Sequence, residues 1–559
     1  MITHGKCQME TIKMKTILFL FISLIFFQVT YSQKFGELAQ TPPMGWNSWN
    51  YFATRIDEQT VIGIADAMVE SGMKDAGYQY VTIDDNWQLG RVDKNRQMTV
   101  NGRDASGVLL ANTQKFPNGI KAVADYVHSK GLKFGLYTSP GLRTCTGCNG
   151  SQGYEETDLK TFADWGVDFI KLDWCGCRED KEEVLARWRA AMDKIERPIV
   201  LSVNVGYEYP LIRKHANMWR TTGDIMNVWS YPPDTAHRFF SICDVIEAQA
   251  GLESYQEPGF WNDPDMLQVG NGQLSEDENR AHFSMWAMLG APLIAGNDLR
   301  NMTDAVRDIL TNREVIAIDQ DPLGYPGRII AEPDDGLQIW FKRLQQPTSG
   351  AIALLNHNKK PVRIELKFSD LGLFGPVFIR DLWKHKDMGQ FEKSFSTEVP
   401  GHGVVLLKLF TYERFDPMVN FPAIPDEGSV FEVESGHQIM KLFTIGNSYK
   451  GFTGSGYALG HAVPYDARFT WLFPVAKSGR YRVGIRYSLG NAEPISAAIR
   501  INETDRRAVT FSPTGGWDKW ETLFFEVNLE RRVNHLCFYG GDNELNVIAL
   551  DHLRVIPCK

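Results

Sequence analysis

One stretch decides how the rest of the chain folds: Val167-Asp168-Phe169-Ile170-Lys171-Leu172-Asp173-Trp174-Cys175. It has the pattern of a buried strand that ends in charged residues. Because side chains alternate along a strand, Lys171 and Asp173 lie on the same face. The ordinary reason for a lone Lys-x-Asp is a structural ion pair. The alternative is a nucleophile, in which Lys171 lowers the pKa of Asp173 and keeps its carboxylate ionised at neutral pH.

Around this stretch, short apolar strands alternate with amphipathic helices from residue 40 to residue 323. Strands are expected at 44–47, 80–83, 133–137, 169–172, 199–203, 218–219, 260–262 and 293–295. Helices are expected at 60–72, 119–130, 159–165, 181–196, 235–251 and 278–289. Eight such repeats predict a (β/α)8 TIM barrel. An open doubly wound sheet is the alternative, which the lack of a glycine-rich phosphate loop after the first strand disfavours.

Polar residues gather where the predicted strands end. These residues are Asp84, Asp85, Tyr137, Asp173, Arg220, Asp224, Asp263 and Asp265. In a barrel all of these strand ends meet on the carboxyl face, which is where barrel enzymes place their chemistry. The pattern therefore favours the nucleophile over the isolated ion pair.

After residue 323 the sequence pattern changes from alternating strands and helices to short β-prone runs. Short β-prone runs from 324 to 410 predict an antiparallel β-sandwich. Residues 411–429 contain three prolines and are predicted to form a linker. Aromatic-rich strands from 430 to 559 predict a second sandwich of the jelly-roll type. The predicted fold class is thus an α/β barrel followed by two β-sandwiches.

The bulk properties of the 559 residues limit the possible partners and the compartment. The net charge is −9 and no basic stripe is present, so nucleic acid is not an expected partner. Residues 1–32 have the pattern of a signal peptide, with two lysines before an apolar run and cleavage expected after Ser32. An N-terminal membrane anchor is the alternative, and no later stretch is long enough to span a bilayer. We therefore expect a secreted or periplasmic protein; the sequence does not indicate its oligomeric state.

Seven of the eight cysteines remain once Cys7 is set aside with the signal peptide. Four of these cluster in the sequence: Cys145, Cys148, Cys175 and Cys177. Their CxxC and CxC spacings fit a zinc site in a cytosolic protein, but disulfides are expected in an exported one. If all four pair, at least one of the remaining three is unpaired: Cys243, Cys537 and Cys558.

Six motifs resemble those of glycoside hydrolase family 27, the retaining α-galactosidases and α-N-acetylgalactosaminidases. They begin at Pro42 (PPMGWNSW), Ile83 (IDDNW), Lys171 (KLDWC), Trp219 (WRTTGDI), Trp261 (WNDPDM) and Ile318 (IDQDPLG). They occur in the family's order and spacing over about 370 residues. The resemblance implies a barrel followed by a sandwich, a retaining exo-acting α-galactosidase, and no cofactor for catalysis.

The resemblance also implies a role for individual residues. Asp173 would be the nucleophile and Asp224 the general acid/base, about 5 to 5.5 Å apart as retaining enzymes require. Proximity to a second carboxylate would raise the pKa of Asp224. The implied substrate-binding residues are Trp49 against the apolar face of the sugar, Asp84 and Asp85 at its O4 and O6 hydroxyls, and Tyr137, Cys145, Lys171, Arg220 and Asp265 around it. Cys145 would form a disulfide with Cys175 at the rim.

The chain departs from the family pattern at three places. Asn86 stands where the family usually has a cysteine, and Ala216 stands where its disulfide partner would lie. Many members have Cys-Glu-Trp after the fifth strand, where this chain has Ser202-Val203-Asn204-Val205-Gly206-Tyr207. The resemblance therefore does not identify the residues that meet the 2-position of the sugar. We expect the bulky Tyr207, with Glu208 beside it, to disfavour a 2-acetamido group.

The last domain resembles carbohydrate-binding jelly rolls that begin with a Tyr-Glu-Ala-Glu-like strand, here Phe431-Glu432-Val433-Glu434. Such domains commonly carry a structural calcium, which here would lie at Glu432, Glu434 and Asp551. The alternative is a sandwich that only packs on the enzyme. For the whole chain, the alternatives to an α-galactosidase are an α-N-acetylgalactosaminidase, a β-L-arabinopyranosidase, and an inactive sugar-binding protein.

Overall fold

The computed structural model describes residues 35–95, 97–205, 212–232, 239–415, 424–433, 438–441, 443–460, 468–502, 505–531, 533–540 and 548–558. The chain divides into two units, Met1–Gly36 and Glu37–Lys559, and every element below belongs to the second. The predicted signal peptide, Tyr207, Glu208 and Glu434 lie outside the described residues. Within the described part of the chain, none of the helices has the length and hydropathy that a membrane span requires.

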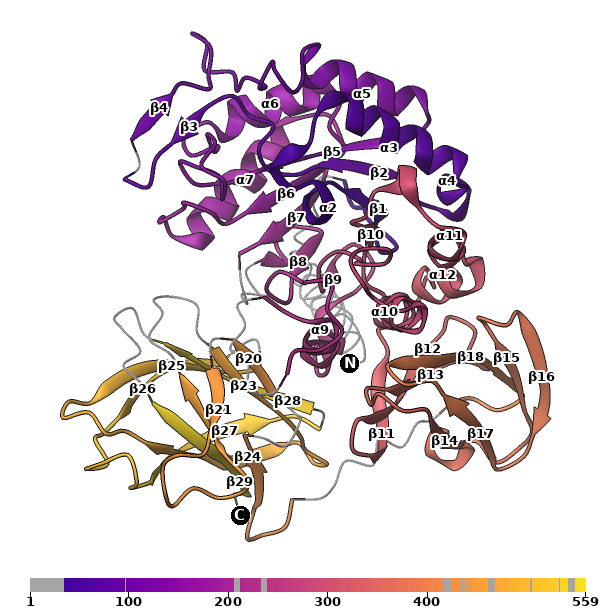
Figure 1. Ribbon diagram of the computed structural model, residues 1–559, viewed down its shortest axis with the longest axis vertical. Coiled ribbons are helices and arrows are strands. Elements are labelled where there is room, and N and C mark those ends of the chain that lie inside the picture. The colour runs from indigo at the N-terminus through magenta and orange to yellow at the C-terminus, as the bar shows by residue number, and fades with distance from the viewer. Residues whose placement is uncertain are drawn as a thin grey trace, which may run out of the picture. The chain divides into compact units, whose positions relative to one another are not determined.

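The first domain contains a parallel eight-stranded sheet that curls into a barrel, with helices around it (Figure 1). Its eight strands are β1 (Met44–Asn47), β2 (Tyr80–Ile83), β5 (Lys133–Thr138), β6 (Phe169–Asp173), β7 (Val200–Asn204), β8 (Met218–Arg220), β9 (Trp261–Asp263) and β10 (Leu293–Ala295). They are hydrogen-bonded in the order β10-β1-β2-β5-β6-β7-β8-β9. An isolated parallel bridge joins Ala295 of β10 to Leu267, which lies four residues after the end of β9. The predicted barrel is confirmed, and every strand lies within two residues of its expected bounds.

The barrel helices follow the strands. They are α3 (Glu58–Glu70), α5 (Gly119–Ser129), α6 (Glu155–Trp165), α7 (Lys181–Lys194), α9 (Ile242–Gln249), α10 (Glu276–Leu289), α11 (Asp304–Leu310) and α12 (Arg313–Asp319), with the single turns α2 (Trp49–Phe52) and α4 (Met73–Ala76). Side-chain caps fix several starts, since Ser241 and Ser275 each form a capping box with the third helical residue. The helix predicted from residue 235 therefore begins only at Ile242, and residues 235–238 lie outside the described part.

One excursion from the barrel was not predicted. After β2 the chain forms a small hairpin of β3 (Arg91–Val92) and β4 (Met98–Val100) before it reaches α5. The strands are too short and too exposed to give a hydrophobic alternation in the sequence.

The second domain is an antiparallel β-sandwich. Its strands are β11 (Arg328–Asp334), β12 (Leu337–Arg343), β13 (Ser349–Asn356), β14 (Val362–Lys367), β15 (Val377–Asp381), β16 (Lys386–Phe391), β17 (Ser394–Val399) and β18 (Gly403–Thr411). Six of them form the sheet β11-β12-β13-β18-β15-β16, and β14 pairs with β17. Lys342 on β12 donates a hydrogen bond to the carbonyl of Ala287 on α10 (2.9 Å), which joins this sheet to the barrel.

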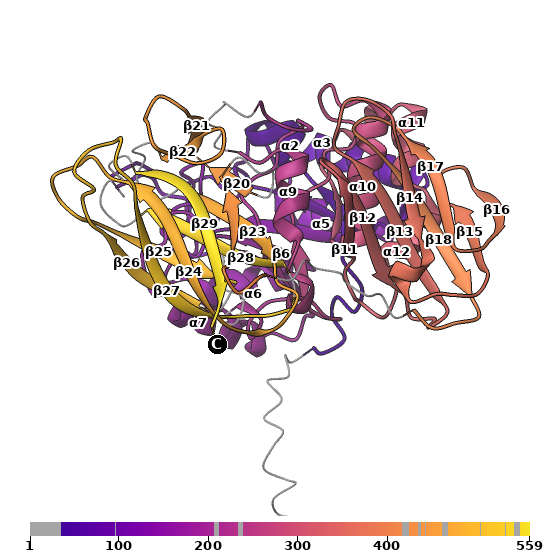
Figure 2. The ribbon, with the colours of Figure 1, turned by 90° about the horizontal axis from the view of Figure 1, so that it is seen from below.

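The last domain also consists of two antiparallel sheets around their own apolar core (Figure 2). Its strands are β19 (Ser429–Glu432), β20 (Gln438–Lys441), β21 (Phe443–Gly446), β22 (Tyr457–Gly460), β23 (Arg468–Pro474), β24 (Gly479–Ser488), β25 (Ile495–Ile501), β26 (Asp505–Phe511), β27 (Glu521–Leu529), β28 (Val533–Gly540) and β29 (Ala549–Pro557). One sheet has the order β21-β22-β29-β24-β27, with β19 also on β29, and the other has β20-β23-β28-β25-β26. Part of the predicted linker, residues 416–423, is not described.

Candidate active site

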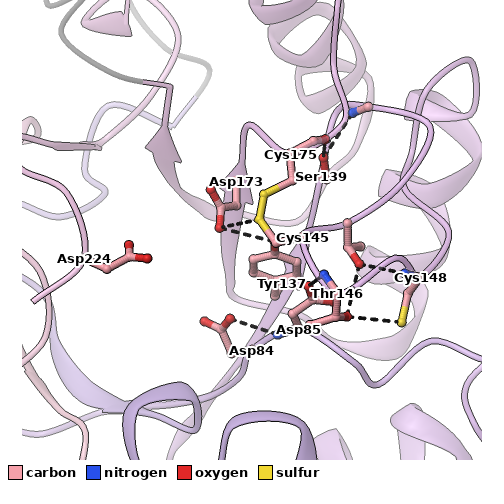
Figure 3. The surroundings of a disulfide bond; sticks show 12 residues. Asp84, Asp85, Tyr137, Ser139, Cys145, Thr146, Cys148, Asp173, Cys175 and Asp224 are labelled. Atoms are coloured by element: carbon pink, nitrogen blue, oxygen red, sulfur yellow. Dashed lines mark hydrogen bonds between the residues drawn. A yellow bond between two sulfur atoms is a disulfide. The ribbon is translucent and has the colours of Figure 1, made fainter. Parts of the chain in front are cut away.

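A cavity of about 370 Å³ opens among the strand ends of the barrel. The structure brings together in its lining all ten described residues expected at the site: Trp49, Asp84, Asp85, Tyr137, Cys145, Lys171, Asp173, Arg220, Asp224 and Asp265. The eleventh, Tyr207, lies outside the described residues. Figure 3 shows the carboxyl groups of Asp84, Asp173 and Asp224 turned toward one common space.

Asp173 is the last residue of β6, and its side chain points into this space. The Tyr137 hydroxyl donates to Asp173 Oδ2 (3.2 Å). Burial raises the pKa of Asp173 to about 6, although Lys171 acts to lower it, while Asp224 acts to raise it. Lys171 thus lowers this pKa as expected, but the loss of solvation outweighs the ammonium, so the pKa of Asp173 lies above its usual value.

Lys171 makes its direct contact with a different carboxylate. Its Nζ lies 2.9 Å from Asp84 Oδ2, and both side chains are nearly buried. The Asn47 side-chain amide donates to the same oxygen (2.8 Å). Burial alone would lower the pKa of Lys171, but Asp84 and Asp173 outweigh it and raise the pKa above its usual value. Lys171 is thus a fixed cation beneath the cavity.

Asp85 is fixed by the backbone of two loops. The amide of Thr146 donates to Asp85 Oδ2 (2.8 Å), and the amide of Asn86 donates to Oδ1 (2.6 Å). Asn86 has a left-handed backbone (φ 81°), which Asn tolerates better than most residues. Its side chain accepts a hydrogen bond from Lys115 Nζ (2.6 Å) and donates to Thr146 Oγ1 (3.1 Å). Hydrogen bonds therefore join these loops at the position where the family resemblance implied a cysteine.

Arg220 links the two carboxylates on the other side of the cavity. Its guanidinium donates to Asp265 Oδ2 (2.8 Å) and to Asp224 Oδ1 (3.2 Å). Asp265 is buried, whereas the Asp224 side chain is 58% exposed. Burial raises the pKa of Asp265, and it raises that of the neighbouring Asp263 to about 6. Asp224 thus lies at the mouth of the cavity, where it can meet both a bound group and solvent.

Cys145 and Cys175 form a disulfide at the rim of the cavity (Figure 3), as the family resemblance implied. Cys148 is a buried thiol that accepts a hydrogen bond from Arg91 (2.8 Å). The clustered cysteines therefore supply one disulfide, as expected in kind, while Cys148 keeps its thiol. The sulfurs of Cys145 and Cys175 bond to each other, so they do not serve the alternative zinc site.

The cavity is also lined by residues that the sequence analysis missed: Asn50, Ala53, Ile225, Met226, Asn227, Phe239, Met266 and Gln268. Ile225 and Met266 are the last residues of two quoted motifs, and most of the others lie within two residues of a motif, which was the only signal they gave. Phe239 gave none, because its place follows from the backbone pairing of the next residue, Phe240, with Asp224 and Met226.

The predicted calcium site in the last domain is only partly described. Glu432, Asp551 and His552 place ligand atoms within 4.8 Å of one another. The buried Asp551 carboxylate, however, already forms an ion pair with Arg486, and Thr453 donates to it through its backbone amide (2.9 Å) and its hydroxyl (3.1 Å). Arg486 also donates to the carbonyl of Gly451 (2.9 Å). Calcium binding here was not tested and stays a prediction. The described residues do not fit it, because the Asp551 carboxylate that would bind calcium is already paired with the Arg486 guanidinium.

Replacing Arg486 by Met should destabilise the last domain. The change would leave a buried carboxylate without its cation, which costs about 3–5 kcal/mol. Calorimetry of the full chain should show a lower melting temperature for one transition, while Arg480→Met, which alters an exposed arginine on the same strand, should leave it unchanged. Treatment with EDTA should not change the wild-type transition. A lower melting temperature after chelation would show that calcium binds.

The barrel and the first sandwich each match a known family model. Residues 41–321 match the family model described as Alpha galactosidase A. Residues 334–409 match that of the Alpha galactosidase C-terminal beta sandwich domain.

Individual relatives agree with these matches. The chain is 41% identical over 399 residues to Alpha-galactosidase A of Cellvibrio japonicus (strain Ueda107), covering 68% of this chain and 94% of that protein. It is 33% identical over 394 residues to Alpha-N-acetylgalactosaminidase of Gallus gallus, covering 66% and 93%. The crystal structure of α-galactosidase I from Mortierella vinacea superposes with a TM-score of 0.62 at 34% identity, covering 68% and 99%. The chain therefore belongs to the α-galactosidase A family of glycoside hydrolases.

Proposed function

We propose that this protein is a retaining, exo-acting α-galactosidase that removes terminal α-D-galactosyl residues from oligo- or polysaccharides. The observation that carries the proposal is the arrangement of Asp173 and Asp224, which face each other across a cavity among other carboxylates. The higher identity to the α-galactosidase than to the α-N-acetylgalactosaminidase supports galactose as the sugar. An inactive sugar-binding protein would not need two such carboxyl groups.

The chemistry follows from the environment of each carboxyl group. Asp173 attacks the anomeric carbon and forms a galactosyl ester, while Asp224 gives its proton to the departing oxygen. Asp224 then takes a proton from water, which attacks the same carbon and releases Asp173. The Tyr137 hydroxyl, which donates to Asp173, is placed to orient the nucleophile. Two inversions at one carbon retain the α configuration.

The fixed carboxylates suit recognition of hydroxyl groups. Asp84 and Asp85 are held by Lys171 and by loop amides, so their free lone pairs can accept hydrogen bonds from O4 and O6 of galactose. Trp49 offers an aromatic face in the same cavity. These assignments stay predictions.

Two further predictions concern the ends of the chain. Residues 1–32 as a signal peptide, and hence a secreted or periplasmic location, are consistent with the Cys145–Cys175 disulfide. Glycan binding by the last domain is our proposal for its role, with packing on the enzyme as the alternative.

Asp173→Ala should abolish turnover without unfolding the protein, because it removes the group that forms the covalent intermediate. Asp224→Ala should reduce kcat/KM by about 10²–10⁴-fold on substrates with poor leaving groups. It should reduce it far less on activated aryl α-galactosides, which leave without a proton. Steady-state kinetics on the two kinds of substrate measure this difference. Equal losses would rule out Asp224 as the acid, and β-galactose as the first product by NMR would rule out retention.

The pH dependence of kcat/KM should reveal the pKa of Asp173. The nucleophile reacts only when ionised, so activity should fall as the pH drops through about 6. Since Lys171 acts to lower this pKa, Lys171→Met should move the acidic limb to higher pH, in addition to lowering the maximum rate. The profile should be measured on an aryl α-galactoside. An unmoved limb in the variant would show that another group controls it.

Three substrates should rank in the order α-galactoside, β-L-arabinopyranoside, α-N-acetylgalactosaminide. Asp84 and Asp85 are both short, so they leave space for the hydroxymethyl group that arabinopyranose lacks. The predicted position of Tyr207 would clash with a 2-acetamido group. A clash or a lost buried hydrogen bond costs about 1–3 kcal/mol, or one to two decades in kcat/KM. A preference for the acetamido substrate would show that Tyr207 points away from the cavity.

A further inference from the structure

A second cavity, of about 190 Å³, opens beside the β3–β4 hairpin that leaves the barrel after β2 (Figure 1). Its lining comes from two segments of the chain, one within residues 98–107 and the other within residues 142–154. It shares no lining residue with the catalytic cavity, and the mechanism proposed above does not use it. It is therefore a separate site whose role is open.

One tight turn separates the two cavities. An antiparallel bridge pairs Arg143 with Asn149, and between them the amide of Thr144 donates to the carbonyl of Cys148 (2.9 Å). Cys145, inside the turn, lines the catalytic cavity, whereas Asn149, at its end, lines the second cavity. These two residues are four positions apart, so their Cα atoms lie within about 14 Å of each other. A molecule of a few sugar units can therefore reach both cavities.

An aromatic ring is held in a fixed position at the second cavity. The Arg103 guanidinium lies 3.9 Å from the ring centroid of Tyr154 and covers one face of the ring. Arg103 is itself fixed, because it donates to both carboxylate oxygens of Asp158 (2.6 and 2.8 Å) and to the carbonyl of Gly150 (2.8 Å). Tyr154 is nevertheless 42% exposed, so the other face of its ring is open to a ligand. An aromatic face of this kind can pack against the apolar face of a pyranose.

The same cavity contains a buried amide without a partner. Asn149 is 2% exposed, and a Cβ atom at Gly90 or Gly102 would lie 1.4 or 2.8 Å from its Oδ1, so the backbone of these glycines packs against that end of the amide. Neither Oδ1 nor Nδ2 makes a hydrogen bond within the part of the chain that the structure describes. Because Oδ1 faces the glycines, Nδ2 is the end that can donate to a ligand. A ligand hydroxyl that accepts this hydrogen bond would offset the cost of the buried, unpaired donor.

The charges at this cavity favour a neutral, polar ligand. Arg103 is neutralised by Asp158, while Asp104 adds an exposed carboxylate to the lining. Asp104 would repel an anionic ligand, and an apolar ligand would leave Asn149 unpaired. We propose that this cavity is a second carbohydrate-binding site, which holds a neutral sugar unit of a polysaccharide backbone while a galactosyl branch occupies the catalytic cavity. This role rests on the proposed galactosidase activity, to which it adds a binding site outside the catalytic cavity.

The test compares a polymeric substrate with a small one. Tyr154→Ala and Asn149→Ala should each lower kcat/KM for release of galactose from galactomannan, a neutral branched polysaccharide, by about tenfold. Both should leave kcat/KM for 4-nitrophenyl α-galactoside within about twofold, because this substrate is too small to reach the second cavity. Asn149→Ala breaks no side-chain hydrogen bond among the described residues, so it should not lower the melting temperature. Tyr412→Ala is the control, since Tyr412 is 81% exposed and lies outside both cavities; it should leave both substrates unaffected.

A binding measurement tests the site without catalysis. In native gels that contain galactomannan, with free galactose added to fill the catalytic cavity, the polymer should retard the wild-type protein more than either variant. Equal mobility of the wild type and both variants would overturn the proposed site.

The kinetic outcomes are also distinct. Equal losses on the polymer and on the small substrate, with an unchanged melting temperature, would show that the two residues only support the turn beside the galactose site. No loss on the polymer would show that they bind no part of it; both results overturn the proposed site. If the wild-type protein does not hydrolyse 4-nitrophenyl α-galactoside, the proposed function fails, while the gel measurement still tests the second cavity. A melting temperature for each variant separates misfolding from lost binding, and Asn149→Ala provides the test if Tyr154→Ala does not fold.

Discussion

The site depends on two buried cations that hold carboxylates at the strand ends. Lys171 contacts Asp84, and Arg220 contacts Asp265 and Asp224. Without these cations, burial would favour the neutral form of each carboxyl group, and the site would lose its ionised acceptors. Lys171 lies in the middle of β6 and Arg220 is the last residue of β8, so the barrel strands themselves set the positions of both cations.

The carboxylates proposed to bind the sugar contact a cation directly, whereas the proposed nucleophile does not. Asp84 and Asp265 each have a cation within 2.9 Å. Among the described residues, the near polar partner of Asp173 is the Tyr137 hydroxyl, besides a weak contact with the sulfur of Cys145. A carboxylate neutralised by a close cation is a poor nucleophile, because the attacking lone pair is already engaged. Burial raises the pKa of Asp173 to about 6, because Lys171 only partly offsets the loss of solvation. It still remains mainly ionised at neutral pH.

The sequence predicted the parts of the fold that follow from local pattern. The strand period placed Lys171 and Asp173 on one face, and the alternation of elements predicted the barrel. It did not identify Asp84 as the contact of Lys171, because the two residues are 87 positions apart and meet only when the barrel closes. For the same reason the sequence could not find Phe239. A pairing between two loops depends on tertiary geometry, which no periodicity encodes.

Two left-handed residues show how the chain keeps carboxylates at the right place after each strand ends. Asn86 (φ 81°) follows Asp85, and Asp265 (φ 82°) follows β9 by two residues. A residue other than glycine in this conformation is strained, and Asn and Asp reduce the strain by bonding to nearby backbone. Asp265 does so, since its own Oδ1 accepts from the amide of Met266 (2.8 Å) while its amide donates to Asp263 Oδ1 (2.9 Å). The same carboxylate that would bind substrate therefore also turns the chain. A change of Asp265 to a β-branched residue would remove both the acceptor and the turn, so loss of binding there could not be separated from loss of local structure.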